Sequence, residues 1–144
     1  MTKQRLTLRS LILLPAILVF GLGSGFFLAA DRWKEAQPAE LAVIYIGADD
    51  CGPCIEWRRA DRPQFLASQE FTQLHYREVI SSTLFDLSKE EHWPDNLREF
   101  RDEFSRLPGA PMWFVVGDEK ILLTARGLRE WREVALPRLK SLVR

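Results

Sequence analysis

The sequence has two cysteines, and both lie in the run Cys51-Gly52-Pro53-Cys54. A pair with this spacing can exist as two thiols or as one disulfide, and it passes between the two states by thiol–disulfide exchange. The attacking species in that exchange is the thiolate, so the reaction needs surroundings that lower a cysteine pKa. The sequence therefore predicts redox chemistry at this run, and no dissociable cofactor is needed for it.

The segments on either side of the cysteines predict such surroundings. Residues 41–47 (LAVIYIG) are apolar and β-branched, which is typical of a strand buried on both faces. Residues 54–68 mix apolar and charged side chains as a surface helix does. A helix N-terminus has unpaired backbone N–H groups and about half a positive charge, which favour a thiolate. We expect Cys51 to be the exposed nucleophile and Cys54, almost one turn later, to be the resolving thiol.

The neighbours of the cysteines have distinct expected effects. Gly52 leaves the approach to Cys51 open, and Pro53 suits a first helical turn because its missing N–H has no intrahelical acceptor. Asp49 and Asp50 come directly before Cys51, and two negative charges there oppose the thiolate. We predict that both carboxylates raise the Cys51 pKa and favour basic partners over acidic ones.

Two other uses of the cysteine pair stay open at this point. A metal site would need further ligands, and the sequence offers only His75 and His92 as imidazoles. His75 lies in a predicted strand and His92 in a polar loop, so we interpret both as ordinary residues and assign no metal ligand. A purely structural disulfide is the second use, although closing so small a loop removes little entropy from the unfolded chain.

The rest of the chain predicts a small α/β domain. The further elements are, in order, a strand over 74–80, a helix capped by Asp95, strands over 112–116 and 120–125 joined around Gly117-Asp118, and a C-terminal helix. The first of these helices has one apolar face, made of Leu97, Phe100, Phe104 and Leu107. We expect Pro63 to kink the helix that contains it, and Pro137 to bend or restart the C-terminal helix. Alternating strands and helices followed by a hairpin indicate a mixed sheet covered by helices.

The order of these elements and two motifs resemble the thioredoxin family. The motifs are the Cys51–Cys54 run between a strand and a helix, and Gly109-Ala110-Pro111 at the start of the strand hairpin. The resemblance covers roughly 41–143 and implies a minimal thioredoxin-like fold: strand–helix–strand–helix–strand–strand–helix, with a mixed four-stranded sheet. It also implies that Pro111 is a cis-proline facing the cysteines and that Ala110 exposes its backbone to an extended substrate.

Three departures from the family pattern predict a specialised member. The family usually has tryptophan just before the first cysteine, where this chain has Asp50. The family's buried acid six positions before that cysteine is Tyr45 here, so a carboxylate proton relay from this position is absent. The helix proline is Pro63, four positions later than usual.

The first forty residues differ in composition from the rest. Residues 10–30 contain no charged side chain, and 21 helical residues span about 31 Å, close to the hydrocarbon thickness of a bilayer. The charges before them are all basic, which predicts a cytoplasmic N-terminus over 1–9 and translocation of the remainder. We expect a transmembrane helix or signal anchor over 10–30, a linker over 31–40 and the thioredoxin-like domain over 41–144.

Composition and charge limit the partners. The chain has 144 residues with 20 basic and 20 acidic side chains, so it lacks the basic footprint of a nucleic-acid-binding protein. The expected function is that of a single-pass inner-membrane thiol–disulfide oxidoreductase that reduces periplasmic protein disulfides and receives electrons from a membrane thiol conduit. Secretion to the periplasm after signal cleavage is the alternative location. A redox-inert binding module that uses the groove near Pro111, and a metal chaperone that uses His75 or His92, are the rival functions.

Overall fold

The computed structural model describes residues 38–143. The predictions for 1–9 and 10–30, and for most of the linker, lie outside these residues. The helices and strands are β1 (Leu41–Ala48), α1 (Gly52–Glu56), α2 (Arg62–Leu66), β2 (His75–Ser81), α3 (Arg98–Arg106), β3 (Met112–Gly117), β4 (Lys120–Arg126), α4 (Gly127–Glu130) and α5 (Leu136–Leu142). Within the described part, no helix is both long enough and apolar enough to cross a membrane.

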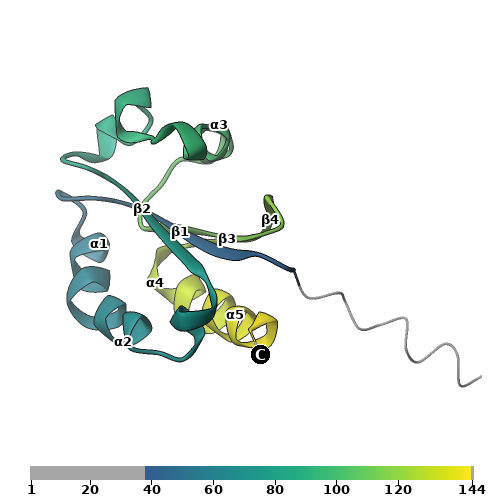
Figure 1. The fold of residues 1–144 in the computed structure, drawn as a ribbon. Helices are drawn as coiled ribbons and strands as arrows, with labels where there is room; N and C mark the ends of the chain where they lie inside the picture. Colours follow the sequence, from purple (N-terminus) through teal and green to yellow (C-terminus); the bar gives the residue numbers. More distant parts are fainter. Residues whose placement is uncertain (1–37, 144) are drawn as a thin grey trace, which may run out of the picture. The chain divides into compact units, whose positions relative to one another are not determined.

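The four strands form one mixed sheet in the order β2-β1-β3-β4 (Figure 1). β1 pairs in parallel with β2, whereas β3 is antiparallel to both β1 and β4. β1 and β3 occupy the centre, and nearly all of their residues are buried, as their unbroken apolar runs predict. The predicted minimal thioredoxin-like sheet is therefore confirmed for this part of the chain.

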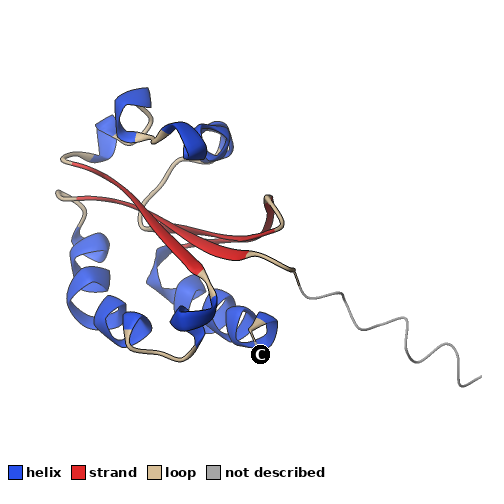
Figure 2. Ribbon diagram, in the orientation of Figure 1, coloured by secondary structure: helices blue, strands red, loops and turns tan. Residues whose placement is uncertain are grey.

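Helices cover both faces of the sheet (Figure 2). α1, α2, α4 and α5 lie on one face, which we call the aromatic face because it buries Tyr45, Trp57, Trp113 and Trp131. α3 and the short turns before it cover the other face, which we call the cysteine face because its buried cluster includes Cys51 and Cys54. The two faces take alternate side chains of the same strands, as the pleat requires.

Both prolines lie inside continuous helical runs. Each lies just after a π-helical segment, Trp57–Asp61 before α2 and Trp131–Ala135 before α5, and the helical path continues. In these segments the N–H of Arg62 donates to the Trp57 carbonyl and that of Leu136 to the Trp131 carbonyl. A proline cannot donate the ordinary i to i−4 bond, and the wider turn rearranges the pairing around it.

Two local predictions on the α3 side are wrong. Asp95 does not cap a helix: it begins a 3₁₀ turn, Asp95–Leu97, and its carboxylate lies 2.9 Å from the Arg98 guanidinium. Leu107 follows the end of α3 and is 50% exposed, whereas the other three apolar residues of that face are buried. α3 itself begins only at Arg98, because the turn before it is stabilised by backbone bonds from Pro94 onward.

The hairpin turn lies one residue later than predicted. Asp118 and Glu119 take its two positive φ values, 49° and 64°, and Gly117 ends β3. Asp118 tolerates this conformation because it is bound on both sides to Glu40: its N–H donates to the Glu40 carbonyl at 3.0 Å, and its carboxylate accepts from the Glu40 N–H at 3.1 Å. Gly117 is needed for space instead, since a Cβ there would lie 2.6 Å from Leu122 Cδ1.

Candidate redox-active site

Cys51 and Cys54 form a disulfide at the start of α1. Cys51 is the N-cap residue in an extended conformation, and its sulfur accepts a hydrogen bond from the Cys54 N–H at 3.2 Å. Pro53 lies in the first turn, where no bond from its nitrogen is required. The sequence prediction that β1 and a helix start hold the pair is confirmed.

The cysteines are more enclosed than the sequence predicts. Cys51 is only 3% exposed and Cys54 is fully buried, whereas Gly52 and Pro53 are exposed. The expectation of an exposed Cys51 is therefore wrong for this oxidised state. Both cysteines belong to the same apolar cluster as Leu87, Trp93 and Leu97, which are buried residues of the segment between β2 and α3.

The motif Gly109-Ala110-Pro111 lies at the same end of the sheet as the cysteines. The Ala110–Pro111 peptide bond is cis. Ile46 pairs with Met112, so these two residues come beside the end of β1 from which the chain continues to Cys51. Ala110 packs against the cluster that contains the disulfide, and the Pro111 carbonyl accepts from the Gly127 N–H at 2.8 Å. The structure thus brings the two motifs together.

The two aspartates before Cys51 are both engaged. Asp49 Oδ1 lies 2.9 Å from Arg58 Nη1, in an ion pair at the surface. Asp50 Oδ1 accepts a hydrogen bond from the Leu84 N–H at 2.9 Å. Their effect on the Cys51 pKa stays a prediction, and the nearby guanidinium offsets part of the Asp49 charge.

Tyr45, at the position of the family's acid, is buried on the aromatic face. Its hydroxyl has no hydrogen-bond partner, and burial raises its pKa to about 12, so it is a neutral phenol at pH 7. The hydroxyl end lies over Gly47, where a Cβ would come within 2.6 Å of Tyr45 Cζ. Trp57 and Trp113 contact the ring at centroid distances of 5.7 and 5.5 Å, and their indole N–H groups are unpaired as well.

Sequence reasoning missed the turn that follows β2. Leu84–Asp86 is a 3₁₀ turn joined to Asp50 by the Leu84 N–H, and its Phe85 is 93% exposed. Residues 81–94 read as a polar loop with no periodicity. Leu84 and Phe85 are adjacent apolar residues inside this polar loop, and they are the sequence signal that could have indicated the turn.

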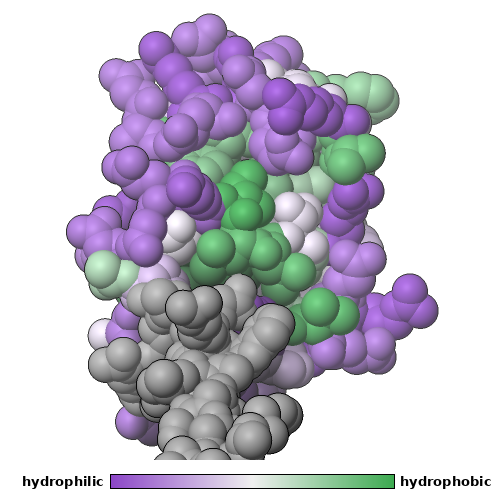
Figure 3. Space-filling view, turned by 90° about the vertical axis from the view of Figure 1, so that its right-hand side faces the viewer, coloured by the Kyte–Doolittle hydropathy of each residue, from purple (hydrophilic) through white to green (hydrophobic). Residues whose placement is uncertain are grey.

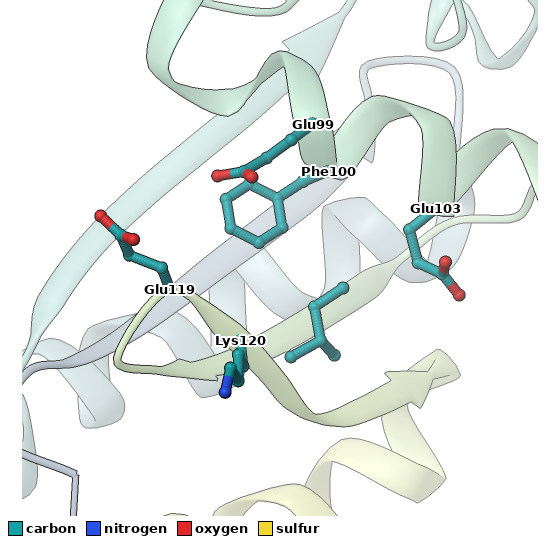
Figure 4. Close-up of a pocket in the computed structure, with 6 residues that line it drawn as sticks. Glu99, Phe100, Glu103, Glu119 and Lys120 are labelled. Carbon is teal, nitrogen blue, oxygen red and sulfur yellow. The ribbon is translucent and has the colours of Figure 1, made fainter.

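The described chain also has a shallow pocket of about 460 Å³. It lies between α3 and the β3–β4 turn and is lined by Glu99, Phe100, Glu103, Glu119, Lys120 and Ile121 (Figure 4). On the side of the molecule that carries this hairpin, hydrophobic residues gather in the centre with hydrophilic ones around them (Figure 3). The pocket contains neither cysteine, and within residues 38–143 no three His, Cys, Asp or Glu side chains are grouped so that they could hold a metal ion.

A mixed four-stranded sheet, a disulfide in a Cys-x-x-Cys run at a helix start, and a cis-proline whose preceding residue, Ala110, packs against the same cluster are the features of a thioredoxin-like fold. No protein-family model matches the sequence, and no curated protein matches it. Among solved structures, the chain is similar to the reduced periplasmic thioredoxin SoxS from Paracoccus pantotrophus, with 15% identity and a TM-score of 0.51 over 72% of this chain and 98% of that one. At such identity the similarity establishes the fold.

Two further solved structures have lower TM-scores. Thioredoxin f2 from Chlamydomonas reinhardtii has 16% identity and a TM-score of 0.47, covering 79% of this chain and 90% of its own. The germline-specific thioredoxin Deadhead from Drosophila melanogaster has 18% identity and a TM-score of 0.49, covering 81% and 94%.

Proposed function

We propose that this protein is a thiol–disulfide oxidoreductase that reduces disulfides of extracytoplasmic proteins. The observation that carries the proposal is the Cys51–Cys54 disulfide at the start of α1, in one cluster with Ala110 of the cis peptide. A structural disulfide would not need a helix N-terminus, whereas a reactive thiolate is stabilised by one.

The reaction runs in two exchange steps. The Cys51 thiolate attacks one sulfur of the substrate disulfide, forms a mixed disulfide and releases the other sulfur as a thiolate. Cys54 then gives its proton to the substrate thiolate released in the first step and attacks the Cys51 sulfur, so the Cys51–Cys54 bond forms and the second substrate thiolate leaves. Two electrons pass from the protein to the substrate. The 3.2 Å hydrogen bond from the Cys54 N–H to the Cys51 sulfur supports Cys51 as the sulfur that carries negative charge.

Ala110, before the cis-proline, would pair its backbone with an extended substrate segment. The uncharged run over 10–30 supports placement in the inner membrane with the domain in the periplasm, or secretion there. A reductase in that compartment must be reduced again, so a membrane thiol conduit is the proposed electron donor.

The test is an equilibrium of the full chain with reduced and oxidised glutathione, followed by a protein-disulfide reduction assay. We expect a potential near that of reducing thioredoxins, about −270 mV, together with catalytic reduction. A potential near about −120 mV would instead indicate an oxidant.

A redox-inert binding module is the second candidate, and the burial of both cysteines favours it. In that case the disulfide would fail to equilibrate with glutathione at any ratio of its two forms, while the folded chain would still bind a partner through the region near Pro111.

A further inference from the structure

The loops that follow β1 and β2 are joined beside the disulfide. The two strands are parallel and end side by side, with Ala48 paired to Ser81. The Asp49 N–H donates to the Ser81 carbonyl at 3.0 Å, and the Leu84 N–H donates to the Asp50 carboxylate at 2.9 Å. The turn after β2 is therefore fixed to the residues directly before Cys51.

This turn is ordered on both sides of Phe85. The Ser81 hydroxyl donates to the Thr83 carbonyl at 2.6 Å, and the Asp86 N–H donates to the same carbonyl at 3.1 Å. Leu87, two residues after Phe85, is buried in the cluster that contains the cysteines. A large aromatic side chain is thus held in solvent by a well-bonded turn.

The exposure of Phe85 is unusual within this domain. At 93% it is about twice that of the other exposed large apolar residues of the described chain, which are 44–50% exposed. Single exposed apolar residues are common on protein surfaces, so exposure alone means little. Phe85 differs from Leu122 and Val134 because its turn is bonded to the residue next to the reacting sulfur.

We propose that Leu84 and Phe85 form an apolar docking arm for the protein whose disulfide reacts at Cys51, and that Asp50 is the positioning residue of this arm. The inference rests on the proposed function. A partner sulfur that bonds to Cys51 brings its neighbouring residues onto the surface beside Asp50, where this arm lies. The occupant is therefore an extended segment with an apolar side chain next to its cysteine, because burying Phe85 against such a side chain removes both from water.

The test compares two synthetic peptides, each with one intramolecular disulfide, that have either leucine or serine beside the cysteine. The reduced full chain is mixed with each peptide, and with hydroxyethyl disulfide as a substrate without side chains, and the rate constants are measured by acid quenching and mass analysis. We expect the leucine peptide to react about tenfold faster than the serine peptide, which corresponds to about 1.4 kcal/mol and is reasonable for partial burial of a phenylalanine.

Phe85→Ser is expected to lower the ratio of the two peptide rate constants to about one, and Phe85→Leu to keep most of it. Val134→Ser is the matched control, since it removes another exposed apolar residue and should leave the ratio and all three rates unchanged. Asp50→Ala should lower the ratio because the Leu84 N–H loses its acceptor, whereas Asp50→Asn should keep it because an amide oxygen also accepts.

The outcomes separate the docking arm from the proposed function. If the wild-type chain reduces none of the three disulfides, the proposed function fails and the arm with it. If it reduces all three but does not distinguish the peptides, or if Phe85→Ser keeps the ratio, the docking arm is overturned and the oxidoreductase stands. Equal loss of the ratio in Asp50→Asn and Asp50→Ala would overturn the positioning role of the Asp50 hydrogen bond.

Discussion

The two faces of the sheet are built in different ways. On the aromatic face, four rings of Tyr45, Trp57, Trp113 and Trp131 lie within 4.9–5.7 Å of one another in five contacts, under long helical segments. On the cysteine face, the covering elements are three short 3₁₀ turns and one nine-residue helix. The contrast places the ring-to-ring packing of these four side chains on one face, and it places the reacting sulfurs on the other face in an apolar cluster covered mainly by short elements.

The largest expected effect comes from replacing a cysteine, which changes the cysteine face alone. Cys54→Ser is expected to abolish turnover and to accumulate mixed disulfides on Cys51, because the resolving attack is lost. Cys51→Ser is expected to abolish turnover and to trap almost nothing. Non-reducing gels followed by mass analysis measure the trapped species, and thermal unfolding checks that both variants stay folded. Equal trapping by the two variants would contradict the assigned roles.

High pH should lower the free energy of unfolding through Tyr45 on the aromatic face. Below pH 10 Tyr45 is neutral in both the folded and the unfolded chain, so its contribution to stability is fully present there. Above pH 10 the unfolded chain ionises first, because the folded pKa is about 12, and stability falls by about 1.4 kcal/mol per pH unit until the folded pKa is reached. Urea unfolding between pH 8 and 12, with the disulfide intact, measures this loss.

Tyr45→Phe is the matched variant for this pH dependence. It should flatten the alkaline decline, and at pH 7 it should be neutral or slightly stabilising, because the buried hydroxyl has no hydrogen-bond partner. Burial raises the pKa of Tyr76 too, so some decline should remain in the variant. An unchanged alkaline slope in Tyr45→Phe would show that its ionisation does not limit stability.

A pair of tryptophan substitutions sharpens the comparison of the faces. The Trp93 indole on the cysteine face donates to the Leu87 carbonyl at 2.7 Å, whereas the Trp113 indole on the aromatic face has no partner. Trp93→Phe and Trp113→Phe remove similar volumes from buried positions, but only the first leaves a buried carbonyl unpaired. We expect Trp93→Phe to lower the free energy of unfolding by about 1–2 kcal/mol more than Trp113→Phe does. Equal losses in urea unfolding would argue against the hydrogen bond.

On the aromatic face, the sequence predicted the buried strands but not which of their side chains meet. The pleat places Tyr45 and Trp113 on one side of the sheet, but β1 and β3 are apolar throughout, so no alternation in the sequence indicates which residues share a face. The π-helical turns were not predicted, because a proline signals a lost hydrogen bond without telling how the backbone restores it.

On the cysteine face, the sequence predicted the cysteines, the helix start and the region of Pro111. It did not predict the burial of Cys51 in one apolar cluster with Leu87 and Trp93, because these two residues belong to a loop without periodicity. The roles of Asp49 and Asp50 depend on partners 9 and 34 positions away, Arg58 and Leu84, and local spacing does not show such pairing.

The smallest expected effect concerns these two aspartates. A negative charge beside Cys51 raises its thiol pKa, and at an exposed loop most of the interaction is lost to solvent and salt, so we expect less than about one pKa unit for both together. Asp49→Asn is the less clean test, because it also leaves the Arg58 guanidinium near the site without its partner. Asp50→Asn keeps the oxygen that accepts from Leu84 and removes only charge, so it isolates the electrostatic effect.

Thiolate absorbance titration of the reduced chain at low and high salt should show a lower Cys51 pKa in Asp50→Asn at low salt, with the difference shrinking at high salt. A lower pKa stabilises the reduced form, so the same variant should be a slightly weaker reductant against glutathione. If the pKa is unchanged at low salt, Asp50 acts at this site through its hydrogen bond to the turn after β2 and not through its charge.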